Sequence, residues 1–119
     1  MELNGIIEMG IRNLSDDVLF VTLPQEPQLQ LELAAVNEIV SNRADYDVVI
    51  DFSSGEIVTS SSISNLLILH NLLDKKGRRL ILCNVGFLTR CVFTVIGLDT
   101  FFNFAEDKFA ALAVIQHSE

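Results

Sequence analysis

The sequence predicts an α/β fold: one mixed sheet of about five strands, with about four helices packed mainly on one side. Residues 48–50 and 80–83 are short apolar runs, typical of strands that are covered on both faces. Residues 61–75, which lie between them, repeat apolar side chains at helical spacing. A strand, a helix and a strand in this order form a right-handed crossover, so we expect the two strands to be parallel.

The first part of the chain is predicted from turn signals and apolar spacing. Residues 5–12 and 18–23 are expected to form two strands, joined by a polar connection at 13–17 that suits a hairpin. The two prolines of residues 24–27 end the second strand, because proline has no backbone donor. Apolar residues then recur at helical spacing and predict a first helix over 29–42.

The last part of the chain continues the same alternation. We expect a helix over residues 87–96 that Gly97 ends, a short strand over 102–104 and a last helix over 106–116. No linker, repeat or low-complexity tract interrupts the sequence, and 119 residues is a usual length for one core. We therefore predict a single domain over residues 1–119.

The chain is strongly acidic. Sixteen acidic and eight basic side chains give a net charge of −8, and four of the basic ones fall within residues 75–79. An acidic surface repels a phosphate backbone, so we expect no direct binding of nucleic acid. The basic cluster is typical of a solvated loop between a helix and a strand, and an anion site is the alternative.

Cofactor and membrane signals are missing from the sequence. Cys83 and Cys91 lie in apolar surroundings without the spacing of a zinc or redox motif, which predicts buried free thiols. No glycine-rich phosphate loop, dinucleotide fingerprint or metal-binding pair is present, so we expect neither a cofactor nor a metal. No segment reaches the roughly 18 apolar residues that span a bilayer, and the expected location is cytoplasmic without membrane insertion.

Catalytic residues are also missing. A nucleophilic serine needs a base within hydrogen-bonding reach, and the sequence offers only His70 and His117. His70 follows Ser60 by ten residues, which is roughly 15 Å along a helix. We therefore predict no catalytic residue, no enzymatic activity and a packed or half-exposed His70.

The richest polar feature is the run of four hydroxyls at residues 59–62, where a strand gives way to a helix. One hydroxyl is explained as a helix N-cap, which contributes roughly 1 kcal/mol. The others exceed what one cap requires, and a helix start can also receive a phosphate group. Capping and phosphorylation both remain open. Asp51 ends the preceding strand, where it is either a site residue or the acceptor of a turn.

The helix after this run has two faces. The core face is predicted to hold Ile63, Leu66, Leu69, His70 and Leu73. The opposite face holds Ser61, Asn65, Ile68 and Leu72. An apolar strip beside a phosphorylatable hydroxyl suits a docking surface that a phosphate switches. The alternative is that this face is covered by the protein itself or by a second copy.

The sequence resembles the STAS domain family, and within it the small bacterial anti-sigma factor antagonists, or anti-anti-sigma factors. The resembling motifs are Asp51-Phe52-Ser53, Thr59-Ser60-Ser61-Ser62-Ile63, Leu80 to Val85, Ile96-Gly97-Leu98-Asp99 and Phe101-Phe102. The resemblance implies a SpoIIAA-like fold and a protein partner that is both serine kinase and anti-sigma factor. It implies phosphorylation of Ser60, with Asp51, Thr59 and Ser61 in the partner-binding surface.

The sequence departs from the family pattern at three places. Thr59 stands where the family usually has aspartate, Ser62 and Ser64 stand where it usually has glycine, and residues 24–27 replace a Gly-x-Leu-Asp segment. The leading expectation is an antagonist switched at Ser60, with or without a homodimer. The alternative is an unphosphorylated STAS scaffold, or an accessory subunit of a transporter or sensory complex.

Overall fold

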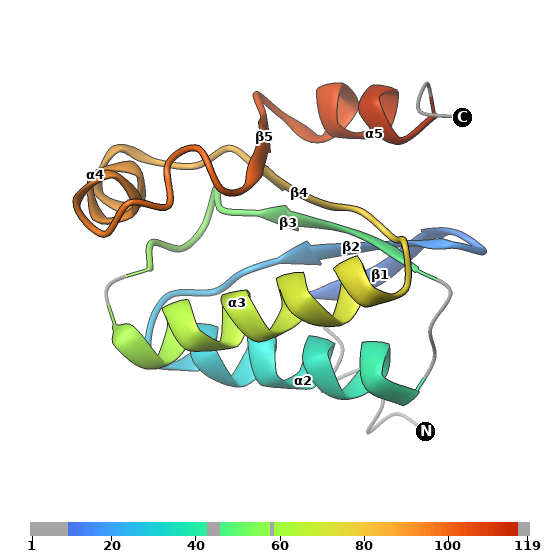
Figure 1. Cartoon of the computed structure of the whole chain (residues 1–119), viewed down its shortest axis with the longest axis horizontal. Coiled ribbons are helices and arrows are strands. Elements are labelled where there is room, and N and C mark those ends of the chain that lie inside the picture. Colours follow the sequence, from blue (N-terminus) through green and yellow to red (C-terminus); the bar gives the residue numbers. More distant parts are fainter. Residues whose placement is uncertain (1–9, 43–45, 58, 117–119) are drawn as a thin grey trace.

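The structure is a computed structural model that describes residues 10–42, 46–57 and 59–116. Within these residues five strands and four helices form (Figure 1). In chain order they are β1 (Ile11–Ser15), β2 (Val18–Thr22), α2 (Gln28–Asn42), β3 (Asp47–Asp51), α3 (Ser60–Lys75), β4 (Leu80–Cys83), α4 (Phe87–Val95), β5 (Asn103–Ala105) and α5 (Lys108–Gln116). Positions 5–9 of the predicted first strand, and His117, lie outside the described residues.

The strands form one mixed sheet in the order β1-β2-β3-β4-β5. β1 is antiparallel to β2, and every later neighbour is parallel. β3 and β4 pair with Val48 opposite Leu80 and Ile50 opposite Leu82, which confirms the predicted crossover through α3. The carboxyl ends of four parallel strands therefore meet at one edge of the sheet.

Both faces of the sheet are covered. α2 and α3 lie side by side on one face, and α5 lies on the other (Figure 1). The central strands explain this, because alternate residues point to opposite faces: Val48 and Ile50 join the core under α2 and α3, whereas Val49 joins the core under α5. The prediction of strands covered on both faces is confirmed, and the helix on the second face is α5.

Some predicted boundaries were wrong by a few residues. β1 continues to Ser15, so the hairpin connection is shorter than predicted. Most side chains of β1 are exposed, and polar residues suit such an edge strand. The last helix begins at Lys108 rather than 106, and the Asp107 side chain accepts a hydrogen bond from the Ala110 amide (2.9 Å).

The predicted core face of α3 is largely confirmed. Leu66, Leu69 and Leu73 are buried, and Ile63 packs against the same core while partly buried. His70 is half-buried, with its ring 4.5 Å from the ring of Phe101 between centroids. His70 is therefore packed and half-buried, as predicted, and the structure adds that its neighbours are the aromatic rings of Phe101 and Phe102.

Candidate functional site

The hydroxyl run lies at the start of α3, at the carboxyl edge of the sheet. Thr59 is the N-cap: its backbone is extended (φ −121°, ψ 150°) and its Oγ1 accepts a hydrogen bond from the Ser62 amide at 3.1 Å. Capping therefore accounts for Thr59. Ser60 and Ser61 are exposed, and among the described residues neither side chain has a hydrogen-bond partner. Their hydroxyls are free for a role outside the fold.

A glutamate from another part of the chain holds the first turn of α3. The Glu26 carboxylate lies after β2, and its Oε2 accepts hydrogen bonds from Ser62 Oγ (2.6 Å) and Thr59 Oγ1 (3.2 Å). Ser62 is fully buried, so this bond satisfies a hydroxyl that water does not reach. A negative charge at a helix start also stabilises the helix, because it lies at the positive end of the helix dipole. Sequence reasoning missed Glu26, whose only signal was an acidic residue between two prolines.

Asp51 is a turn acceptor in this structure. Its side chain is buried, and its Oδ1 accepts hydrogen bonds from the Ser53 amide (3.0 Å) and from Asn84 Nδ2 (2.8 Å). Its Oδ2 accepts a third hydrogen bond from Ser53 Oγ (3.0 Å). Both oxygens are thus occupied in joining the turns that follow β3 and β4. Burial, with the charge of Asp51 as the second cause, raises the pKa of the neighbouring Cys83 thiol to about 12.

The predicted docking face of α3 is divided by its neighbour α2. Asn65 and Leu72 are partly buried, and Asn65 Nδ2 donates to the Gln30 carbonyl of α2 (3.3 Å). The alternative in which the protein covers its own helix therefore holds for Asn65 and Leu72. Asp74 and Lys75 are exposed at the end of α3, and the exposed residues before them form a neutral strip, which we call the open ridge. It consists of Ser60, Ser61, Ser64, Ile68 and Asn71.

A second glutamate links the loop before α3 to α4. Glu56 Oε1 accepts hydrogen bonds from the amide (2.9 Å) and the hydroxyl of Thr89, in the first turn of α4. Thr89 Oγ1 in turn accepts one from the Ile57 amide (3.0 Å). The N-cap of α4 is Gly86, and a side chain there would collide with Glu56. The segment that carries Ser60 is thus tied to α4 before the helix begins.

A hollow of about 480 Å³ lies between the loops that follow β2, β3 and β4. Glu26 and Glu56 line it, and no basic residue of the described chain does. The described residues contain no group of three or more His, Cys, Asp or Glu side chains that could hold a metal ion.

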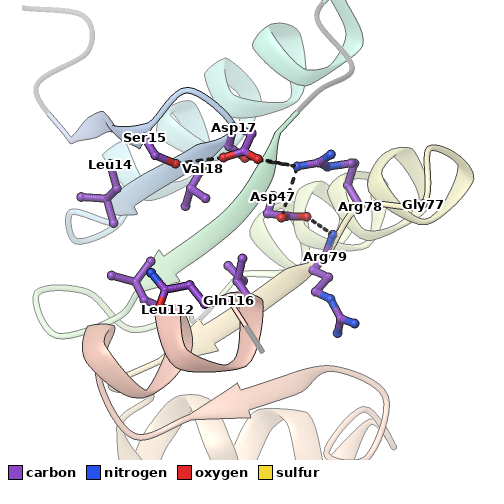
Figure 2. A pocket seen from close by; sticks show the side chains of 11 residues that line it. Leu14, Ser15, Asp17, Val18, Asp47, Gly77, Arg78, Arg79, Leu112 and Gln116 are labelled. Atoms are coloured by element: carbon purple, nitrogen blue, oxygen red, sulfur yellow. Dashed lines mark hydrogen bonds and ion pairs between the residues drawn. The ribbon is translucent and has the colours of Figure 1, made fainter. Parts of the chain in front are cut away.

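The basic cluster lies at the opposite edge of the sheet and is tied into the fold. Asp47 accepts a hydrogen bond from Arg78 Nη2 (3.2 Å) and another from the Arg79 amide (2.8 Å). Figure 2 shows Arg78, Arg79 and Asp47 near Asp17, in a pocket of about 540 Å³ that α5 lines on one side. Lys76 Nζ donates to the Val40 carbonyl at 2.8 Å. The basic cluster therefore bonds the loop after α3 to α2 and to Asp47 of β3. The prediction of a solvated loop was incomplete.

Fold and site together define a class of protein: a small mixed-sheet module whose first helix after the central strand begins with free, exposed serines. Residues 33–111, which are 79 of the 119, match the model of the STAS domain. The chain belongs to the STAS domain family.

Similar solved structures share the whole architecture. RsbS from Moorella thermoacetica is 20% identical, with a TM-score of 0.74, and the match covers 89% of this chain and 92% of RsbS. An anti-sigma-factor antagonist (STAS) domain protein from Planctomyces limnophilus is 19% identical, with a TM-score of 0.75 and coverage of 89% and 97%. The phosphorylated form of the Bacillus cell fate determinant SpoIIAA is 18% identical, with a TM-score of 0.67 and coverage of 87% and 96%. At these identities the likeness establishes the SpoIIAA-like fold.

Among curated proteins, none is significantly similar to this sequence. In the part of the chain that the structure describes, no helix has both the length and the apolar character needed to cross a membrane.

Proposed function

We propose that this protein is an anti-sigma factor antagonist that binds an anti-sigma factor with serine kinase activity and is switched by phosphorylation of Ser60. One observation carries the proposal. Ser60 is exposed at the first position of α3, and the capping role that would occupy a hydroxyl there belongs to Thr59. A kinase can reach the Ser60 hydroxyl without breaking a bond of the fold.

The effect of a phosphate follows from the character of the open ridge. The ridge carries no charge, and Ile68 offers it an aliphatic side chain that is 48% exposed. Phosphorylation of Ser60 would add roughly −1.5 to −2 units of charge at one end of this strip. The helix start tolerates a negative group, whereas an apolar partner surface does not. Phosphorylation would therefore block docking and leave the fold intact.

Glu26 supports Ser60 as the phosphoacceptor despite the missing family aspartate. The carboxylate that Thr59 cannot supply reaches the same turn from the segment after β2 and binds both Thr59 and Ser62. We propose that Glu26 orients the first turn of α3 for the kinase. Asp51 would act indirectly, because it shapes the loop through Ser53 and Asn84.

The relatives support the same general type of protein. Two of the similar solved structures are described as SpoIIAA in its unphosphorylated form and in its phosphorylated form. We extend this to a cytoplasmic, non-enzymatic regulator, with the whole chain as one STAS domain. Two free cysteines are in keeping with a reducing compartment.

A second candidate is a STAS scaffold that is never phosphorylated, either in a sensory complex or as an accessory subunit of a transporter. Thr59 in place of aspartate favours it. So does a similar chain, 20% identical with a TM-score of 0.68, from a structure described as the molecular architecture of the stressosome, a signal integration and transduction hub. In that role the open ridge would dock permanently.

Phosphorylation by the cognate kinase separates the two candidates. The protein is incubated with this kinase and ATP, and the phosphate is located by mass spectrometry. We expect Ser60→Ala to abolish labelling and Ser61→Ala, the matched control on the next exposed hydroxyl, to retain it. Undiminished labelling of Ser60→Ala would show that Ser60 is not the phosphoacceptor. Consistent absence of phosphate in protein from the native host, together with a stable co-purifying assembly, would favour the scaffold.

A further inference from the structure

The outer face of α4 is apolar and open. Of the ten large apolar side chains that are exposed in the described chain, five fall within residues 87–101. Val95 is 84% exposed and Phe87 is 78% exposed, while Thr89 and Phe93 hold the opposite side of the helix in the core. Figure 1 shows α4 at one end of the molecule, apart from α2 and α3. We call the exposed Phe87, Leu88 and Val95, with the partly buried Cys91 between them, the outer face of α4.

The charge around this face favours a second copy of the chain as its occupant. Residues 84–101 contain one basic residue, Arg90, and one acidic residue, Asp99, so their net charge is zero. The whole chain carries −8. Two copies of an acidic chain repel each other where their acidic surfaces meet. Because the surface around α4 has no net charge, two copies can meet there without this repulsion. Arg90 and Asp99 also give a two-fold contact one charge of each sign on each side.

The spacing along α4 suits a symmetric pair of helices. Phe87, Cys91 and Val95 follow at intervals of four residues, so they form one line along the helix with Cys91 at its midpoint. In an antiparallel pair, Phe87 of each copy meets Val95 of the other, and the two Cys91 residues face each other. The small cysteine at the crossing point lets the helices approach. Packed helices lie about 8–10 Å apart, which leaves about 3.5–5.5 Å between facing Cα atoms.

The area of the face is compatible with a dimer of moderate affinity. The exposed apolar side chains of this face, together with Ile96 and Phe101 just beyond the helix, offer on the order of 500 Å², since a phenylalanine alone buries about 150–250 Å². A standard interface takes about 800 Å² from each partner, and a patch of this size on a monomer is often functional. Apolar atoms alone therefore supply more than half of the area that a stable pair needs.

We propose that the outer face of α4 binds a second copy of this chain, as an antiparallel, two-fold symmetric helix pair centred on Cys91. The interface is independent of the Ser60 switch, because no residue of the open ridge of α3 takes part. It is also independent of kinase binding, so the dimer forms whether or not the function proposed above is correct.

The oligomeric state of the full chain tests the interface. Sedimentation equilibrium at 5–100 µM, roughly the range of a moderate interface, should show a monomer–dimer equilibrium. Val95→Glu should yield monomers over that whole range. Leu31→Glu, the matched control at an exposed apolar residue of α2, should dimerise like the parent. A parent protein that is monomeric throughout, or a dimer that survives Val95→Glu, overturns the proposal.

Cross-linking tests the arrangement without any destabilising variant. A short bismaleimide should join two parent chains through Cys91, because the two thiols face each other across the two-fold axis. Cys83 is fully buried and serves as the internal control. Cys91→Ser should therefore remain uncross-linked while sedimenting as a dimer. A dimer that Val95→Glu disrupts but that no reagent joins through Cys91 would show that the helix pair is not antiparallel about this residue.

Discussion

α3 and α4 begin in the same way and present opposite surfaces. Each starts at the carboxyl edge of the sheet, and a glutamate from an earlier loop holds its first turn: Glu26 for α3 and Glu56 for α4. The exposed side chains of α3 are polar except for Ile68, whereas those of α4 are mostly apolar. A hydroxyl can be modified and an aliphatic side chain cannot. Regulated binding therefore suits α3, and constant association suits α4.

The largest expected effect comes from placing a charge on each helix in turn. Ser60→Asp should weaken binding to the kinase partner about 100-fold or more, because burying an unpaired charge costs about 3 kcal/mol or more. The same variant should leave the dimer unchanged. Val95→Glu should abolish the dimer and leave binding to the kinase partner unchanged. Titration calorimetry and sedimentation of both variants check this.

Loss of both interactions in both variants would mean that a single surface serves both partners. Circular dichroism is the control for folding. Both positions are exposed, and an aspartate at the helix start is electrostatically favourable, so we expect parental spectra.

The next effect concerns the two glutamates themselves. Glu56→Ala should lower the free energy of unfolding by about 3 kcal/mol, because the amide and hydroxyl of the fully buried Thr89 lose their acceptor. Glu26→Ala should cost about 1 kcal/mol, since the Ser62 hydroxyl can turn to Thr59 Oγ1 at 3.0 Å. Urea unfolding measures both values.

Glu38→Ala is the matched control for these two variants, because Glu38 is an exposed glutamate of α2. Its free energy of unfolding should stay at the parental value. Equal losses for Glu26→Ala and Glu56→Ala would contradict the difference that the hydrogen bonds imply.

Sequence reasoning succeeded where the signal is local. The four residues of β4 and the long apolar repeat of α3 were predicted almost to the residue, because spacing within one segment determines both. The cap at Thr59 is equally local. These elements, with the family motifs, were enough to predict the fold.

The site was predicted less completely, because its details depend on neighbours that are distant in sequence. Glu26 meets Ser62 only after β2 and β3 have paired, and no pattern within either segment indicates that contact. The apolar spacing within α3 alone places Asn65 on the outer face, whereas in the fold α2 covers it. Cys91 lies in an apolar stretch that predicts burial, but α4 turns part of that stretch outward.

The smallest expected effect is that of a third glutamate, which lacks the partners of the other two. Burial raises the pKa of Glu32 above its ordinary value of 4.5, and a backbone hydrogen bond from Gly10 only partly opposes this. Among the described residues its Oε2 is buried without a hydrogen-bond partner. A raised pKa in the folded state means that the charged carboxylate is penalised at pH 7, and that the penalty disappears as the pH falls below 4.5.

Glu32→Gln should therefore stabilise the protein slightly at pH 7, by less than Glu56→Ala destabilises it, and should have no effect at pH 4. Urea unfolding of parent and variant at both pH values measures this. A gain that persists at pH 4 would trace to packing instead of charge. A loss at pH 7 would mean that the Glu32 carboxylate, like those of Glu26 and Glu56, is held by a donor that stabilises its charged form.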